Sequence, residues 1–227
     1  RVSEDPSRAS GLALLGEPPE PASPPNALDE RMQALAARLR GRGFAGVAFV
    51  RPDPFGVAGE RLVQALSSAA LQAHAEWMAR AVPPRGGTVE RLPVAALGEE
   101  AVRRLGGLGY QQLLLVRLPL LGEACGEFWL LSTSAHLREE QLGTAALEVL
   151  GDWPAWREAL RAAVCPLTPR EREVLRAVAE GLKGSEAQQR FGCTERTFRL
   201  HVENAKRKLR AANGAQAVYR AQLMGGL

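Results

Sequence analysis

Hydrophobic and polar positions along the first half of the chain predict helices and strands in alternation. From Ala27, apolar residues recur every three or four positions, and two glycines then predict the end of a helix. Residues 43–50 form a nearly continuous apolar run that is typical of a buried strand. Residues 59–81 carry a helical pattern again, and two prolines end it. The apolar face of the first helix consists of Leu28, Met32, Leu35 and Leu39.

The next segment predicts the rest of a sheet. Residues 88–94 indicate a short strand and residues 99–105 a short helix. Two apolar runs, at residues 110–121 and 125–134, are separated by a glycine and a glutamate, which is typical of a hairpin. Residues 137–164 then predict a long helix, which a proline interrupts. The order helix, strand, helix, strand, helix, two strands, helix indicates an α+β fold in which helices pack on an antiparallel sheet.

The last quarter of the chain carries signals for a small all-α domain of four helices. Thr168 and Glu171 form a capping box, with proline at the first helical position. Ser185 and Gln188 form a second, weaker capping box, and Thr194 caps a third helix after a glycine turn. A fourth helical stretch, GAQAVYRAQLM, follows.

The third helix, at residues 194–210, has two unlike sides. Its apolar side consists of Phe198, Val202, Ala205 and Leu209. The other side carries Arg196, Arg199, Glu203, Lys206, Arg207 and Arg210. Two helices joined by a tight turn, the second with a basic outer face, form the helix-turn-helix arrangement that places a recognition helix in the major groove of DNA.

Charge separates the two parts of the chain. The 227 residues include 29 Lys and Arg and 25 Asp and Glu, of which 12 basic and six acidic residues lie from Cys165 onward. That segment has a net charge of +6, and the first 164 residues have a net charge of −2. A compact basic module beside a mildly acidic one is typical of a nucleic-acid-binding domain joined to another domain.

Other classes of protein find no support in the sequence. The three cysteines are far apart and the three histidines are isolated, so neither disulfides nor a metal site are predicted. The sequence contains no recognisable nucleophile with its base, no paired-carboxylate site and no phosphate-binding loop. Neither an enzyme nor a cofactor is therefore expected. No apolar run approaches the roughly 20 residues of a membrane span, and a cytoplasmic location is expected.

Composition divides the chain into three parts. Residues 1–26 include EPPEPASPPN and offer almost nothing to bury, so a disordered, proline-rich tail is expected. Residues 27–160 are expected to form a sensory or dimerisation domain. Residues 161–227 are expected to form the helix-turn-helix domain.

A family resemblance is carried by LTPREREVLRAVAEGL, TERTFRLHVENAKRKL and NGAQAV. Together these stretches make residues 167–224 resemble the LuxR/NarL-type DNA-binding domain, including its fourth helix. The resemblance implies that Arg199 and Leu200 lie where bases are contacted and that Thr197 and Lys208 touch the DNA backbone. The expected DNA-binding residues are Thr194, Arg196, Thr197, Arg199, Leu200, Glu203, Lys206, Arg207 and Lys208.

The chain departs from this family in its helical core. Ala187 and Gln188 stand where Ile-Ala is usual, and Ala205 stands where a larger aliphatic residue is usual. Phe191 and Phe198 are larger than the residues they replace, so a repacked core is expected.

Glu203 bears on whether the domain still selects DNA. It stands one turn after Arg199 on the outer face, where its carboxylate would face phosphates, pair with that arginine, or accept from a cytosine. Two functions therefore stay open: a sequence-specific transcriptional regulator, or a protein-interaction module whose helix-turn-helix has lost specific DNA binding.

The N-terminal part resembles the GAF/PAS-like sensory fold over residues 108–150. The autoinducer-binding domain of quorum-sensing regulators is related, and only Trp77 aligns with its pocket motif, so no ligand-binding residue is assigned. The expected partners are double-stranded DNA, a second copy through residues 137–164, a small-molecule or protein signal, and RNA polymerase, with no membrane. The opposite net charges also suggest the hypothesis that the acidic part covers the recognition helix.

Overall fold

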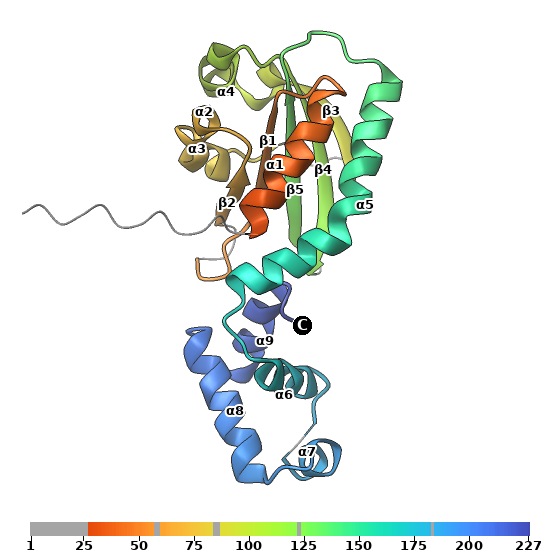
Figure 1. Cartoon of the computed structure of the whole chain (residues 1–227). Coiled ribbons are helices and arrows are strands. Elements are labelled where there is room, and N and C mark those ends of the chain that lie inside the picture. Colours follow the sequence, from red (N-terminus) through yellow and green to blue (C-terminus); the bar gives the residue numbers. More distant parts are fainter. Residues whose placement is uncertain (1–26, 57–59, 84–86, 122–123, 183) are drawn as a thin grey trace, which may run out of the picture.

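The computed structural model describes residues 27–56, 60–83, 87–121, 124–182 and 184–227. A five-stranded sheet with helices on both faces forms one part, and four helices form a second part at its end (Figure 1). One long helix, α5 (Glu139–Val164), leads from the first part to the second. The predicted disordered tail at residues 1–26 lies outside the described residues.

The sheet is antiparallel throughout, with strand order β2-β1-β5-β4-β3. The predicted hairpin is confirmed, because β4 pairs with β5 in a register that places Val116 opposite Phe128. β1 is buried on both faces, which explains its unbroken apolar run. The expected α+β fold is therefore confirmed. The strands are β1 (Gly46–Pro52), β2 (Arg61–Leu66), β3 (Val89–Pro93), β4 (Gln112–Leu121) and β5 (Ala124–Ser132).

The helix predicted at residues 59–81 is wrong in its first half. That stretch forms β2, which pairs with β1 and places Leu66 opposite Ala48. Its apolar residues fit helical spacing locally, but strand pairing at the sheet edge decides the conformation. Only the second half is helical, and it is broken in two: α2 (Ala69–Gln72), capped by the Ser68 hydroxyl, and α3 (Ala75–Arg80).

Helices cover the two faces of the sheet and enclose two separate cores. α1 (Ala27–Arg40) and α5 pack on the face that presents Phe49 and Phe128. α2, α3 and α4 (Glu99–Arg104) pack on the face that presents Trp129. Two short 3₁₀ turns, η1 (Val94–Leu97) and η2 (Gly106–Leu108), flank α4.

The first core is aromatic where α5 crosses the sheet. The Phe49 and Phe128 rings lie 4.7 Å apart, and the Trp156 ring lies 5.0 Å from Phe128 and 5.5 Å from Phe49. Such pairs add to the stabilisation that comes from burying the rings. α5 is thereby held to the sheet on the C-terminal side of Pro154.

The predicted interruption of this helix is wrong, because α5 is continuous from Glu139 to Val164, and the helix bends instead. Pro154 lies inside α5 and has no N–H for the helical ladder. In Figure 1, α5 runs along the sheet, changes direction and passes beneath the sheet's end toward the second part. Proline is the usual cause of such a bend.

We expect Trp156→Phe to change the free energy of unfolding little, whereas Trp156→Ala should lower it by about 3–5 kcal/mol. Among the described residues, the buried indole Nε1 of Trp156 has no hydrogen-bond partner. Phenylalanine removes this unsatisfied donor, which offsets part of the lost ring volume. Urea unfolding of the full chain measures both changes, and equal losses in the two variants would contradict this reading of the indole.

Candidate DNA interface

Four helices build the second part, and a side-chain cap starts three of them. The capping box is confirmed: the Glu171 N–H donates to the Thr168 hydroxyl at 3.2 Å, and the Thr168 N–H donates to Glu171 Oε2 at 2.8 Å. Thr194 caps the third helix through the Thr197 N–H. Asn213 caps the fourth through the Gln216 N–H. The helices are α6 (Pro169–Ala179), α7 (Gly184–Phe191), α8 (Glu195–Lys208) and α9 (Gly214–Leu223).

Aromatic stacking fills the core between α7 and α8. The rings of Phe191 and Phe198 are stacked, with centroids 6.4 Å apart. The Arg170 guanidinium lies 5.1 Å from the Phe191 ring and donates to the Phe191 carbonyl at 2.7 Å. This pairing agrees with a core repacked around two phenylalanines, while the side chains of Ala187 and Gln188 lie outside the described residues.

A partly buried ion pair ties α6 to α8. Lys208 Nζ lies 2.7 Å from Glu171 Oε2, and the Glu171 side chain is almost fully buried. Burial acts to raise the pKa of Glu171, but hydrogen bonds from Lys208 and Thr168 outweigh it, so the pKa lies below its usual value. Lys208, which the resemblance placed on the DNA backbone, thus holds its ammonium against α6.

The outer face of α8 is open to solvent and presents an arginine beside an apolar side chain. The Arg199 side chain is 76% exposed, and Leu200 is 58% exposed. Arg196 and Arg207 are also exposed. The mildly acidic N-terminal part therefore does not cover α8 in this structure, where α8 lies away from the sheet (Figure 1).

Glutamates on α8 hold its cations in place. Arg199 pairs with Glu195, one turn before it, and Glu203 pairs with Lys206 at 2.9 Å. The alternative that Glu203 pairs with Arg199 is wrong. Glu195 was missed in the sequence, although its spacing of four residues from Arg199 signals such a pair.

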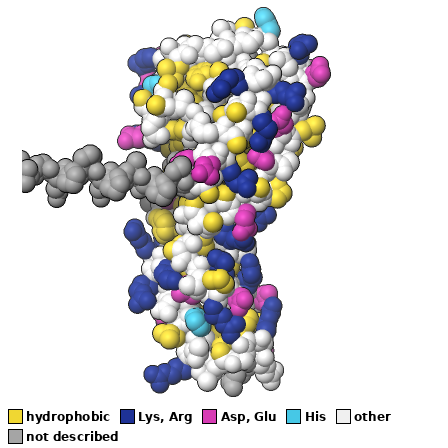
Figure 2. Space-filling view, in the orientation of Figure 1, with side chains coloured by type: hydrophobic (Ala, Val, Ile, Leu, Met, Phe, Trp, Pro, Cys, Tyr) yellow, Lys and Arg dark blue, Asp and Glu magenta, His cyan; other side chains and the backbone are white. Residues whose placement is uncertain are grey.

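The exposed pair of Arg199 leaves its guanidinium available to a stronger anion, whereas the Lys206 side chain is mostly covered. Ion pairs at the surface contribute little to stability because water and salt screen them. Phosphate accepts several charge-assisted hydrogen bonds at once and can replace a side-chain carboxylate. Figure 2 shows Lys and Arg side chains on both sides of the lower part of the molecule, with fewer acidic ones between them.

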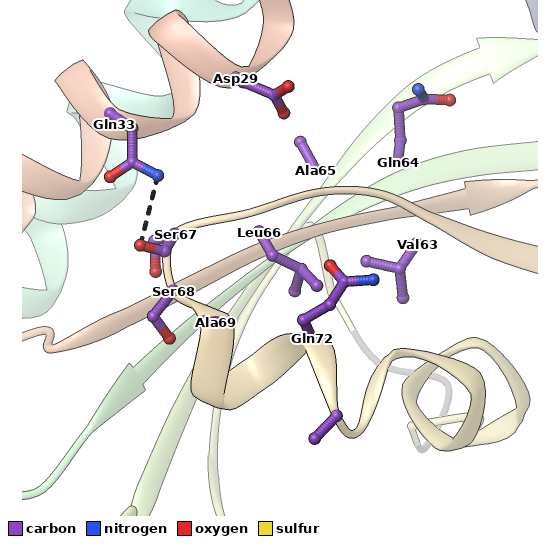
Figure 3. Close-up of a pocket in the computed structure, with 11 residues that line it drawn as sticks. Asp29, Gln33, Val63, Gln64, Ala65, Leu66, Ser67, Ser68, Ala69 and Gln72 are labelled. Atoms are coloured by element: carbon purple, nitrogen blue, oxygen red, sulfur yellow. Dashed lines mark hydrogen bonds between the residues drawn. The ribbon is translucent and has the colours of Figure 1, made fainter. Parts of the chain in front are cut away.

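Two grooves mark the N-terminal part. The first has a volume of about 670 Å³ and lies between α1, β2 and α2 (Figure 3). Gln33 of α1 lines this groove, and its side-chain amide donates to the Ser67 carbonyl at 3.3 Å. The second, of about 400 Å³, lies between α3 and α4 and includes Trp77. The Trp77 and Trp129 rings form a T-shaped pair with centroids 6.4 Å apart, so Trp77 is packed partly against the core.

Within the residues that the structure describes, no group of three or more His, Cys, Asp or Glu side chains could hold a metal ion. The helices of the same residues include none that is long and apolar enough to cross a membrane.

Comparison with known proteins identifies the class of the second part. Residues 165–221 match the family described as "Bacterial regulatory proteins, luxR family". Residues 165–221 thus form a helix-turn-helix domain of the luxR family, as the sequence predicts.

Two curated relatives share this domain. The transcriptional activator protein AnoR of Acinetobacter nosocomialis is 44% identical over 59 residues, which are 26% of this chain and 25% of AnoR. The transcriptional activator protein LuxR of Aliivibrio fischeri is 38% identical over 61 residues, which are 27% of this chain and 24% of LuxR. The match therefore spans about a quarter of these relatives.

Solved structures extend the similarity in fold to both parts. A structure described as SdiA in complex with octanoyl-rac-glycerol has a TM-score of 0.54 and 18% identity, over 86% of this chain and 87% of that one. A crystal structure of Escherichia coli SdiA has a TM-score of 0.51 and 19% identity, over 85% and 89%. At this identity the similarity concerns the fold.

Glu171→Gln should lower the free energy of unfolding by about 1–3 kcal/mol at neutral pH, because it leaves the Lys208 ammonium without its charged partner. The folded-state pKa of Glu171 is depressed, so the carboxylate stabilises the fold at neutral pH, and this contribution is lost as pH falls through that pKa. Wild type should therefore lose more stability than Glu171→Gln on acidification from neutral pH to about pH 3.

Glu173→Gln, at a more exposed carboxylate on the same helix, is the matched control and should lose as much stability on acidification as wild type does. Chemical unfolding at a series of pH values measures all three proteins. Equal acid sensitivity in wild type and Glu171→Gln would contradict the role given to this carboxylate.

Proposed function

We propose that this protein is a sequence-specific transcriptional regulator that inserts α8 into the major groove of DNA. The observation that carries the proposal is the open, capped face of α8 in a domain of the luxR family. A major groove about 12 Å wide admits a single α-helix. The proposed contact residues are Thr194, Arg196, Thr197, Arg199, Leu200, Glu203, Lys206, Arg207 and Lys208.

These residues divide between reading bases and holding phosphates. Arg199 and Leu200 project from the exposed middle of the face, where a guanidinium can bind guanine in bidentate fashion and an apolar side chain can contact a thymine methyl. Thr194 and Thr197 lie at the first turn, where backbone N–H groups favour an anion. Arg207 lies near the last turn and reaches the backbone at the groove's edge.

Arg199→Ala should lower the discrimination between operator and random DNA by about 1–3 kcal/mol, since a bidentate contact to guanine is lost. Arg207→Ala is the matched control and should weaken binding to both DNAs by about the same factor, because phosphates carry no sequence information. Titrations with an operator selected by the wild-type protein and with a scrambled duplex give the ratio. An unchanged ratio in Arg199→Ala would mean that α8 docks differently.

A second copy of the chain belongs to the proposal. A single helix-turn-helix touches few base pairs, and two-fold pairing doubles the site. The outer face of α5 offers a contact surface: Leu147 is 69% exposed, Leu150 is 38% exposed, and a Cβ added to Gly143 or Gly151 would meet open space. Helices approach closely at such positions, and the exposed leucines would gain burial.

Leu147→Arg should turn the dimer into a monomer, because it places a charge in the proposed contact between α5 helices. Binding to a two-half-site operator should then weaken by at least about tenfold, since the avidity of linked half-sites is lost. Light scattering and DNA titration measure the two effects. Val102→Arg, at an exposed apolar residue of α4, is the control and should stay dimeric. A monomeric wild type, free and on DNA, would remove this part of the proposal.

The comparisons support two further proposed partners besides DNA. AnoR and LuxR are named transcriptional activators, which supports RNA polymerase as a further partner. The solved SdiA structure contains octanoyl-rac-glycerol, which supports a small-molecule signal at the N-terminal part of this chain. Such a regulator acts in the bacterial cytoplasm, where DNA is.

The second candidate function is a protein-interaction module without specific DNA binding. The observation that favours it is the pairing of Arg199 and Lys206 with glutamates of their own helix. The two functions differ in salt titrations against genomic fragments. A regulator retains selected fragments over random DNA as salt rises, whereas a module with a basic face binds all DNA weakly and loses it steeply.

A further inference from the structure

An aromatic side chain of the sheet part lies against two arginines of the DNA-binding part. Phe55 stands in the connection between β1 and β2, and the Asp53 carboxylate fixes its backbone by accepting its N–H at 2.9 Å. Its ring centroid lies 5.4 Å from the guanidinium carbon of Arg210 and 5.7 Å from that of Arg220. A guanidinium at this distance over an aromatic face is attracted by the ring's electrons. We call these three residues the Phe55 clamp.

The backbone of Arg210 supports a role for this contact. The end of α8 is a Schellman motif, in which the Ala211 N–H donates to the Lys206 carbonyl and the Arg210 N–H to the Arg207 carbonyl. Arg210 occupies the left-handed position of that motif with φ of 53°, where glycine is preferred because it has no Cβ. Among the described residues it is the one non-glycine residue with positive φ. An arginine held there presents its guanidinium to Phe55, which glycine could not do.

The second arginine is fixed by the same turn. Arg220 of α9 donates from Nη1 to the Leu209 carbonyl at 2.9 Å and to the Arg210 carbonyl. These carbonyls end α8, so the guanidinium closes the helix end while it lies over the Phe55 ring. The Phe55 clamp therefore contacts the turn that joins α8 to α9 through two arginines whose positions that turn fixes.

A second contact, between α5 and the residues after α9, joins the two parts. A Cβ built on Gly225 would lie 3.3 Å from the Arg157 carbonyl of α5, and one built on Gly226 would lie 2.5 Å from Cys165 Sγ. The chain after α9 is thus packed closely on the end of α5. With this contact and the Phe55 clamp, the part formed by α6 to α9 is attached to the rest of the molecule by more than the continuous backbone after α5.

We propose that Phe55 is a positioning residue, which fixes the direction of α8 relative to α5 and so sets the half-site spacing that a dimer reads. The proposal rests on the proposed DNA binding through α8 and dimerisation through α5. If α5 forms the dimer contact, the two recognition helices are held at a distance set by each copy's clamp. A clamped dimer then selects one spacing, and a released one tolerates several.

The test measures the affinity for duplexes whose two half-sites, selected by wild type from a random pool, are moved apart by about half a helical turn, or about five base pairs. Wild type should strongly prefer its selected spacing. Phe55→Ala should reduce that preference by about five- to thirty-fold, the factor that two such contacts can hold. Phe55→Trp should retain the preference, because indole binds guanidinium at least as well as phenyl.

Arg210→Gly separates positioning from folding. Glycine suits the left-handed position, so this variant should keep or raise the thermal stability of the chain while it lowers the spacing preference. A merely structural arginine would leave the preference unchanged. Tyr219→Ala, at an exposed aromatic of α9, is the control and should behave like wild type. If Phe55→Ala and Arg210→Gly both keep the wild-type spacing preference, the proposal is overturned.

Hydrogen exchange without DNA separates this proposal from the proposed function. Phe55→Ala should speed amide exchange in the turn at residues 209–213 and leave α6 unchanged. Faster exchange there, with no specific DNA binding by wild type, would overturn the proposed function and the spacing role but leave the contact established. Unchanged exchange beside specific DNA binding would overturn the clamp alone.

Discussion

The packing of α5 against the aromatic core is the interaction on which the rest of the structure depends. Trp153 and Trp156 flank Pro154 and pack on Phe49 and Phe128, so the helix stays attached to the sheet on both sides of its bend. Its last turns lead to the helix-turn-helix part, and its leucines at positions 147 and 150 are exposed. Because one helix serves all three contacts, a change in its seating on the sheet would move both the proposed dimer contact and the DNA-binding part.

Local chemistry made the helical part of the molecule predictable. The capping box at Thr168 and Glu171, the Thr194 cap and the glycine turn are each set by neighbours within four residues, and the structure confirms them. The β4–β5 hairpin was equally predictable because two long apolar runs adjoin one short turn. Signals of this kind act within the segment that carries them.

Contacts between distant segments could not be predicted in the same way. β2 has helical spacing, and only its pairing with β1 makes it a strand. The Lys208–Glu171 pair joins residues 37 positions apart, and the domain resemblance pointed Lys208 toward DNA. The partner of Arg199 was misjudged for a local reason. Glu195 lies one turn before Arg199 and Glu203 one turn after it, so helical spacing allows either pair. The structure contains the pair with Glu195, whereas only Glu203 was offered as a partner from the sequence.

The close packing of Gly225 and Gly226 on α5 limits how freely this helix-turn-helix part can be exchanged between proteins of similar architecture. A domain is easily recombined when it joins its neighbour through one linker. Here the last residues of the described chain pack on α5. Phe55 also contacts Arg210 in the turn before α9 and Arg220 in α9. A chimaera cut at Cys165 would bring a foreign turn to Phe55 and a foreign tail to Arg157. Compatible exchange would need the helix end, the β1–β2 loop and the glycine pair to be inherited together.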